Sequence, residues 1–114
     1  MAEVFKNKVA ALGTTSDDGV SNGIYTTPGS KVAVVIQCQV ANIDGTNAAD
    51  LSMDLHDTSA SSAKAIVSTL SVPADSAVNP IGGKLVLETG DTLRAWAGAA
   101  SDLEMTLSVL EIDV

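Results

Sequence analysis

The stretch from Gly23 to Asn42, GIYTTPGSKVAVVIQCQVAN, decides the fold class of this chain. A proline-glycine turn leads into a run whose side chains alternate with a period of two, which is the repeat of a β-strand. Because one face of this run is wholly apolar and the other is partly apolar, the pattern predicts a central strand over Lys31 to Asn42. The predicted faces are Val32, Val34, Ile36, Cys38 and Val40 on one side, and Ala33, Val35, Gln37, Gln39 and Ala41 on the other.

Further segments with the same period follow along the chain, and turn residues separate them about every ten residues. No segment shows a convincing helical period. We therefore predict an all-β fold, an antiparallel β-sandwich that is jelly-roll-like and has roughly seven or eight strands. The other predicted strands are Leu51 to Leu55, Ala65 to Val72, Lys84 to Glu88, Thr92 to Ala97 and Leu103 to Ile112.

A chain of 114 residues is long enough for one hydrophobic core, so residues 1–114 are predicted to form a single β-sandwich domain. Residues 1–12 are predicted to form an N-terminal arm. Within it, Val4 to Leu12 fits neither period cleanly, and we interpret it as a strand with a helical turn as the alternative. Only three residues are aromatic, so aliphatic side chains must build the core.

The connections between strands carry their own signals. The Asp-Gly pair within Asn42 to Asn47 predicts a tight hairpin, since both residue types tolerate positive φ. A second hairpin is predicted at Thr89 to Asp91, and Ala74 to Gly83 is predicted to cross from one sheet to the other. Near Val109 the apolar pattern changes parity, which a bulge or a second covered face would explain.

Charge excludes several functional classes. Six basic residues stand against fourteen acidic ones, which gives a net charge of -8. Such a surface repels phosphate backbones and anionic lipids, so we expect neither a nucleic acid nor a membrane as a partner. No apolar run reaches the roughly 18 residues that a membrane span needs. The single cysteine, Cys38, excludes an internal disulfide and is predicted to be a packed, inert thiol in a protein made in a reducing cytoplasm.

Catalytic and metal-binding patterns are weak. His56 and Asp57 lie near Ser59, Ser61 and Ser62, but residues this close along a strand end do not converge as a catalytic triad. Aspartates beside glycines, as at Asp44-Gly45, are read as turn formers, with a loop-bound calcium ion as the alternative. One cysteine and one histidine do not make a zinc site. We therefore predict no catalytic residue, no metal and no cofactor, and expect that the protein is not an enzyme.

Four residues are predicted to contact another subunit or a capsid. Trp96 and Arg94 share one strand face, and both residue types are enriched at protein interfaces. Stacking of a sugar ring on Trp96 is the alternative. In the N-terminal arm, Lys6 and Lys8 carry a third of the positive charge, which suits a clasp on an acidic neighbour.

Three features resemble small accessory proteins of tailed bacteriophages, a decoration or tail-associated class of virion protein. One is the Ile24 to Gly29 segment that opens the valine-rich strand ending at Asn42, and another is the turn Asp44-Gly45-Thr46. The third is the closing pattern from Gly83 to Ala95. Together they extend over residues 20–112.

The resemblance implies a structural protein on the virion surface, made in the host cytoplasm. It implies a capsid decoration (cement) protein that binds the outer capsid lattice as a homo-oligomer, with a homotrimer expected. The partners would be other copies of the chain and the major capsid protein or a tail component. The alternatives are a tail-associated or receptor- or carbohydrate-binding β-sandwich module and, as a third class, a small enzyme.

Overall fold

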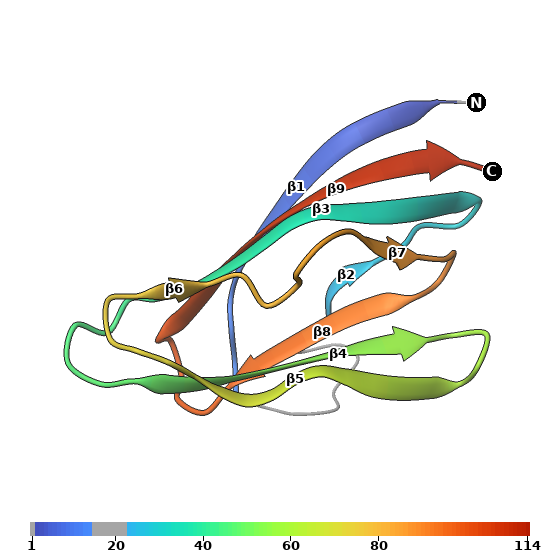
Figure 1. Cartoon of the computed structure of the whole chain (residues 1–114). Helices are drawn as coiled ribbons and strands as arrows, with labels where there is room; N and C mark the ends of the chain where they lie inside the picture. Colours follow the sequence, from blue (N-terminus) through green and yellow to red (C-terminus); the bar gives the residue numbers. More distant parts are fainter. Residues whose placement is uncertain (1, 15–22) are drawn as a thin grey trace.

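A computed structural model describes residues 2–14 and 23–114 of the chain. These residues form two antiparallel sheets packed face to face, so the predicted all-β sandwich is confirmed (Figure 1). The described residues contain nine strands, more than the seven or eight predicted, because two short strands, Gly23–Thr26 and Ala77–Val78, add to the predicted ones. The strands are β1 (Glu3–Ala11), β2 (Gly23–Thr26), β3 (Lys31–Asn42), β4 (Ala49–Asp57), β5 (Ser62–Val72), β6 (Ala77–Val78), β7 (Leu85–Leu87), β8 (Thr92–Ala97) and β9 (Leu103–Asp113).

The first sheet, called sheet A, has the order β1-β9-β3, and the far side of β3 pairs with β6 and β7 at different points along its length. The second, sheet B, has the order β2-β8-β4-β5. The predicted central strand is confirmed, since β3 runs from Lys31 to Asn42 with neighbours on both sides. The strand predicted over Val4 to Leu12 is also confirmed, because β1 pairs with β9 over nine residues as the edge of sheet A.

The hairpin predicted at Asn42 to Asn47 is wrong, because β3 lies in sheet A and β4 in sheet B. Here the Asp44 side chain forms the turn: its Oδ1 accepts hydrogen bonds from the amides of Thr46 at 2.8 Å and Asn47 at 3.1 Å. Gly45 lacks the positive φ of a tight two-residue hairpin. The Asx turn reverses the chain, and the next strand, β4, lies in the opposite sheet.

The hairpin predicted at Thr89 to Asp91 is wrong for the same reason, since β7 belongs to sheet A and β8 to sheet B. Gly90 has a φ of 85°, and the buried Asp91 side chain accepts amide hydrogen bonds from Thr58 and Glu88. The crossing predicted over Ala74 to Gly83 is confirmed. A hairpin does join β4 to β5, which pair in sheet B, through the serine-rich turn that follows β4.

A bulge in β3 corrects the predicted assignment of its faces. The pairing with β9 shifts register between Val35 and Gln37, so Ile36 is the extra residue and is 44% exposed. Ala33 and Val35 therefore point into the sandwich on one side of the bulge, and Cys38 and Val40 do so on the other. The predicted common face of Val32, Val34, Ile36, Cys38 and Val40 is wrong, because one inserted residue inverts the alternation.

Strand β9 keeps one parity throughout, so the flip predicted near Val109 is wrong. Its inward side chains continue from Val109 to Glu111, which is 2% exposed. Leu110 and Ile112 lie on the outer face of sheet A and are half-buried there, in agreement with the second covered face that was the alternative. The irregularity of this pair of strands is the bulge in the neighbouring strand β3.

The core is aliphatic, as predicted, and both sheets contribute to it. Cys38 is 1% exposed, and burial raises the pKa of its thiol to about 11, so its predicted packing is confirmed. Across residues 2–14 and 23–114, no helix has the length and apolar character to cross a membrane. The largest buried core side chains are Val35, Val40, Leu51, Met53, Val72, Leu87, Leu93, Leu103, Met105, Leu107 and Val109.

Candidate interaction surface

Two of the four predicted contact residues, Arg94 and Trp96, lie on the outer face of sheet B. Alternation along β8 sends Leu93, Ala95 and Ala97 into the core and leaves Arg94 and Trp96 on the opposite face. Arg94 is 7% exposed, and its Nε and Nη2 donate to the two carboxylate oxygens of Asp54, each at 2.7 Å. Trp96 is half-buried opposite Ser52. Arg94 thus forms an ion pair within its own domain. A contact of Arg94 or Trp96 with another subunit or a capsid stays a prediction.

The other two, Lys6 and Lys8, lie in β1 at the edge of sheet A. They pair with Val109 and Leu107, which point into the sandwich, so both lysines sit on the inward side of β1. All residues of β1 are exposed except the half-buried Ala10. The structure therefore does not bring the four predicted residues together, and the contact role of the two lysines also stays a prediction.

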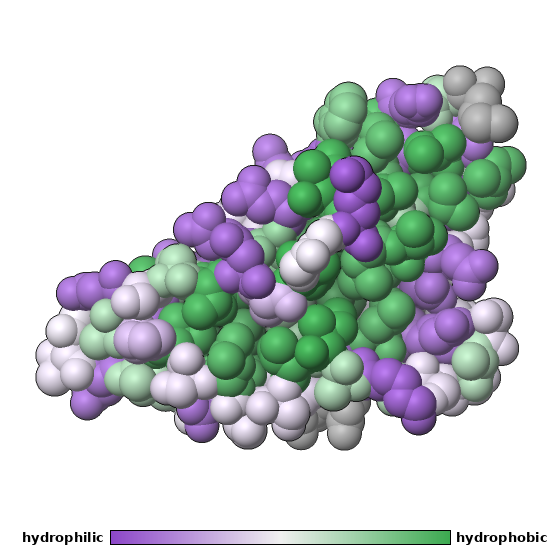
Figure 2. All heavy atoms as spheres, viewed as in Figure 1, coloured by the Kyte–Doolittle hydropathy of each residue, from purple (hydrophilic) through white to green (hydrophobic). Residues whose placement is uncertain are grey.

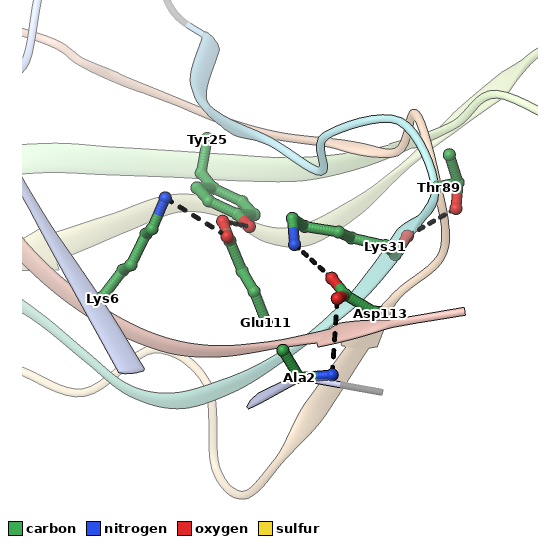
Figure 3. A network of polar contacts seen from close by, with 7 residues as sticks. All are labelled: Ala2, Lys6, Tyr25, Lys31, Thr89, Glu111 and Asp113. Atoms are coloured by element: carbon green, nitrogen blue, oxygen red, sulfur yellow. Dashed lines mark hydrogen bonds and ion pairs between the residues drawn. The ribbon is translucent and has the colours of Figure 1, made fainter. Parts of the chain in front are cut away.

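A polar network ties the N-terminal part of β1 to both sheets (Figure 3). Lys6 Nζ lies 3.4 Å from Glu111 Oε1, and the Tyr25 hydroxyl donates to Glu111 Oε2 at 2.5 Å. Tyr25 belongs to sheet B and Glu111 to sheet A, so this hydrogen bond crosses the sandwich. Burial, reinforced by the neighbouring Glu111 carboxylate, raises the pKa of Tyr25 far above its usual value, which keeps the phenol protonated as a donor.

The same network continues to the ends of β3 and β9 (Figure 3). Lys31 Nζ forms an ion pair with Asp113, whose second oxygen accepts a hydrogen bond from the Ala2 amide at 3.4 Å. The Lys31 ammonium lowers the pKa of Asp113, and the hydrogen bond to Asp113 raises the pKa of Lys31. The Thr89 hydroxyl donates to the Lys31 carbonyl. Sequence reasoning missed Glu111, although the unbroken period from Leu103 would have placed it on the buried face.

Three carboxylates meet where the turn after β4 lies against the turn before β8. Asp57, Glu88 and Asp91 each offer an oxygen within 4.8 Å of the others. Asp57 Oδ1 accepts hydrogen bonds from Ser59 Oγ at 2.8 Å and the Ala60 amide at 3.2 Å, and these bonds lower its pKa. With the two amide bonds to Asp91, they hold the carboxylates of Asp57 and Asp91, so we interpret the cluster as a clamp between turns. A loop-bound calcium ion stays the alternative to this interpretation.

The sugar-stacking alternative for Trp96 would need a second aromatic platform on the same face. Tyr25 pairs with Leu93 and points inward, where its hydroxyl meets Glu111. Trp96 lies three residues from Leu93 on the same strand and therefore on the opposite face. Tyr25 and Trp96 consequently do not form one platform.

The outer face of sheet A carries apolar side chains across four strands. Phe5 of β1, Leu110 of β9, Val34 of β3 and Val86 of β7 are successive Cα partners and form one row. Phe5 is 75% exposed and Val86 59%. Figure 2 shows hydrophobic side chains gathered over the region where these strands lie in Figure 1. We call the following set the outer patch: Phe5, Val32, Val34, Ile36, Val86, Leu110 and Ile112.

Solved structures share the fold. No family model matches the chain, and no curated protein matches its sequence. The Drosophila NLP core, described for pentamer formation and histone binding, aligns over 96% of this chain and 98% of its own, with 12% identity and a TM-score of 0.54. VP2 of infectious bursal disease virus, in a subviral particle, aligns over 97% of this chain with 10% identity and a TM-score of 0.50.

The chain spans 33% of that VP2 chain. A pentameric capsid protein isolated from metagenomic phage sequences aligns over 96% of this chain and 62% of its own, with 16% identity and a TM-score of 0.41. Viral capsid proteins therefore stand among the structural neighbours. At these identities the likeness establishes the shared sandwich fold, and function must be argued from the surface.

Proposed function

We propose that this chain is a structural protein of a bacteriophage virion, a capsid decoration protein that binds the outer capsid lattice as a homo-oligomer. The proposal starts from the sequence resemblance to virion accessory proteins, and the observation that supports it is the fold: 97% of the chain aligns with VP2 of a subviral particle at a TM-score of 0.50, so the sandwich is one that a particle protein uses. The pentamer-forming NLP core has the same fold over nearly its whole length, which supports self-association. The homotrimer and the partner, the major capsid protein, come from the sequence resemblance and belong to this proposal.

The surface described above suits this role. A nine-residue edge strand, β1, leaves its side chains exposed, and an unpaired strand edge is a template for another chain. The net charge of -8 keeps the protein away from nucleic acid and anionic membranes. The proposal assigns no catalytic activity and locates the protein on the virion surface.

The test is binding to shells assembled from the major capsid protein of the phage that carries this chain. Purified protein should sediment with the shells and saturate at a fixed number of copies per lattice unit. Isolated tails of the same phage are the control. Binding to tails and not to shells would contradict decoration in favour of a tail position, and binding to neither would contradict a virion role.

A glycan array on the same preparation addresses the carbohydrate-binding alternative. Because Tyr25 and Trp96 lie on opposite faces of sheet B, we expect no retained sugar. If the wild type retains a sugar and the Trp96→Ala variant does not, carbohydrate binding would replace capsid decoration as the proposed function.

A further inference from the structure

We propose that neighbouring copies of this chain exchange their N-terminal strands, so that the edge of β9 in one copy pairs with β1 of a second copy. The inference rests on the proposed function, because it names the contact that builds the homo-oligomer. The exchanged segment is β1 together with Leu12, which follows it. The receiving surface is the edge of β9 and the buried Glu111 near its end.

Strand β1 is attached to its own chain mainly through β9. It is the edge strand of sheet A, and β9 is the described strand with which it pairs (Figure 1). Its side chains are exposed on both faces, except for the half-buried Ala10. Val4 is the partner of Glu111 and points inward, yet it is 42% exposed. Sheet B therefore leaves this part of β1 uncovered, and the ladder with β9 is what holds the strand.

The edge of β9 is specific for the sequence of β1. Nine consecutive residues of β1 pair with it in unbroken register. Leu12 continues the ladder, because its amide donates to the Leu103 carbonyl at 2.9 Å, and its side chain is 2% exposed in the core. A strand that fits this edge must therefore match the register and end in an apolar side chain. Every copy of the chain carries such a segment.

Glu111 adds the requirement for a cation. It is 2% exposed, and its Oε1 accepts no hydrogen bond from the described residues, while Lys6 Nζ lies 3.4 Å from this oxygen. A buried carboxylate without a neighbouring positive charge is costly. Because Lys6 belongs to β1, the cation arrives with the strand, whichever copy supplies it.

Charge favours exchange over a side-by-side contact of intact copies. Two lysines and one glutamate give β1 a net charge of +1, so the rest of the chain carries -9. Copies that met through these acidic bodies would repel each other. Exchange instead places the positive strand of one copy on the acidic body of the next. The ladder and the ion pair are the same in both arrangements, so exchange loses neither of them.

Exchange also places apolar side chains at a junction between copies. Val4, Phe5 and Val9 are 42%, 75% and 69% exposed in the single chain. An exchanged β1 joins the bodies of two copies, and burial of these side chains at the junction adds to the free energy of association.

The chain length and the symmetry permit this arrangement. Residues 13–22 separate Leu12 from β2 in the sequence, and ten extended residues span about 33 Å. Exchange from each copy to the next is a head-to-tail contact, which closes into a ring. A ring of three copies is the homotrimer of the proposed function.

The test links β1 to β9 and asks whether the two strands belong to one chain. Asn7→Cys combined with Ser108→Cys places thiols on Cα partners of β1 and β9. The matched control, Gln37→Cys combined with Ser108→Cys, does the same for β3 and β9 within the body. Each variant is refolded from an equal mixture of isotope-labelled and unlabelled chains, treated with a bismaleimide and digested. Mass spectrometry should find linked peptides of mixed isotope as often as unmixed ones for the first variant and none for the control.

Self-association gives an independent measurement. Lys6→Met should raise several-fold the concentration at which the oligomer dissociates in light scattering, because Lys6 pairs with Glu111 of another copy. Lys8→Met is the control and should leave that concentration unchanged. A monomeric wild type, linked peptides that are all unmixed, or equal effects of the two lysine variants would overturn the inference. Because shell binding is measured separately, unmixed peptides from a protein that binds shells would remove the exchange and leave the proposed function standing.

Discussion

Glu111 is buried, with 2% of its surface exposed, and the ammonium group of Lys6 on the edge strand lies beside its carboxylate. Lys6→Met should lower the free energy of unfolding by about 1 kcal/mol, because the lysine is partly exposed and the Glu111 carboxylate is left buried with less compensation. Lys8→Met, two residues away on the same side of β1, is the control and should change stability by less than about 0.5 kcal/mol. Equal losses in urea unfolding would contradict the ion pair as the cause.

Arg94 and Asp54 form a bidentate pair in which both residues are almost fully buried. Arg94→Met should cost about 3–5 kcal/mol, because it strands the Asp54 carboxylate. Combining it with Asp54→Leu should recover most of the loss, since neither charge then remains. Urea unfolding measures the stability of both variants. A double variant as unstable as the single one would contradict the unpaired Asp54 charge as the cause of the loss.

Asp113 links stability to pH. Its folded pKa is lowered by Lys31, so its contribution is present above the unfolded value of about 3.9 and is lost as the pH falls through the folded value. The pKa of Lys31 is raised, so the stability that Lys31 contributes is lost only above the unfolded lysine pKa of about 10.4. Asp113→Asn should therefore flatten the fall of the unfolding midpoint between about pH 5 and pH 3. An unchanged slope would contradict this ion pair as a contributor.

At the scale of the elements, the bulge in β3 predicts different outcomes for two single-residue deletions. Deletion of Ile36 should be tolerated, with a lowered melting temperature but a retained fold, because the alternation then runs unbroken from Val35 to Cys38 and keeps both on the inner face. Deletion of Val34 should abolish the folded state, because it moves one end of the strand to the wrong face. Circular dichroism and thermal unfolding measure both, and similar behaviour of the two deletions would contradict the register.

The two wrong hairpins show what local turn chemistry does and does not specify. Asp44 and Asp91 do reverse the chain, through side-chain oxygens that accept backbone amides. A reversal, however, is compatible with a return in the same sheet or a step to the opposite one. The choice depends on which strands bury which faces, and that is settled by contacts far apart in the sequence.

At the scale of the whole molecule, the net charge of -8 opposes assembly of the proposed homo-oligomer. Added salt should therefore tighten self-association, since the Debye length shrinks from about 10 Å at 0.1 M to about 3 Å at 1 M. Light scattering across a sodium chloride series measures the change. Association that weakens with salt would indicate that ion pairs between subunits, and not apolar side chains, dominate the contact.

The sequence by itself determined the fold class, the bounds of the central strand β3, the strand nature of the N-terminal segment, the crossing over Ala74 to Gly83 and the burial of Cys38. Each of these follows from a period of two or from a turn residue, which act over a few neighbouring positions. The acidic surface, which argues against nucleic acid and membranes as partners, is likewise a property of composition.

Only the tertiary structure decided sheet membership, the bulge at Ile36, the Arg94–Asp54 pair and the network around Glu111. It also showed that Phe5, Leu110, Val34 and Val86 share a row, although residues that are neighbours in this row lie more than fifty positions apart in the sequence. The physical reason is common to all these features. Strand pairing brings distant residues into register, and the register fixes which side chains meet in the core and which are left for a partner.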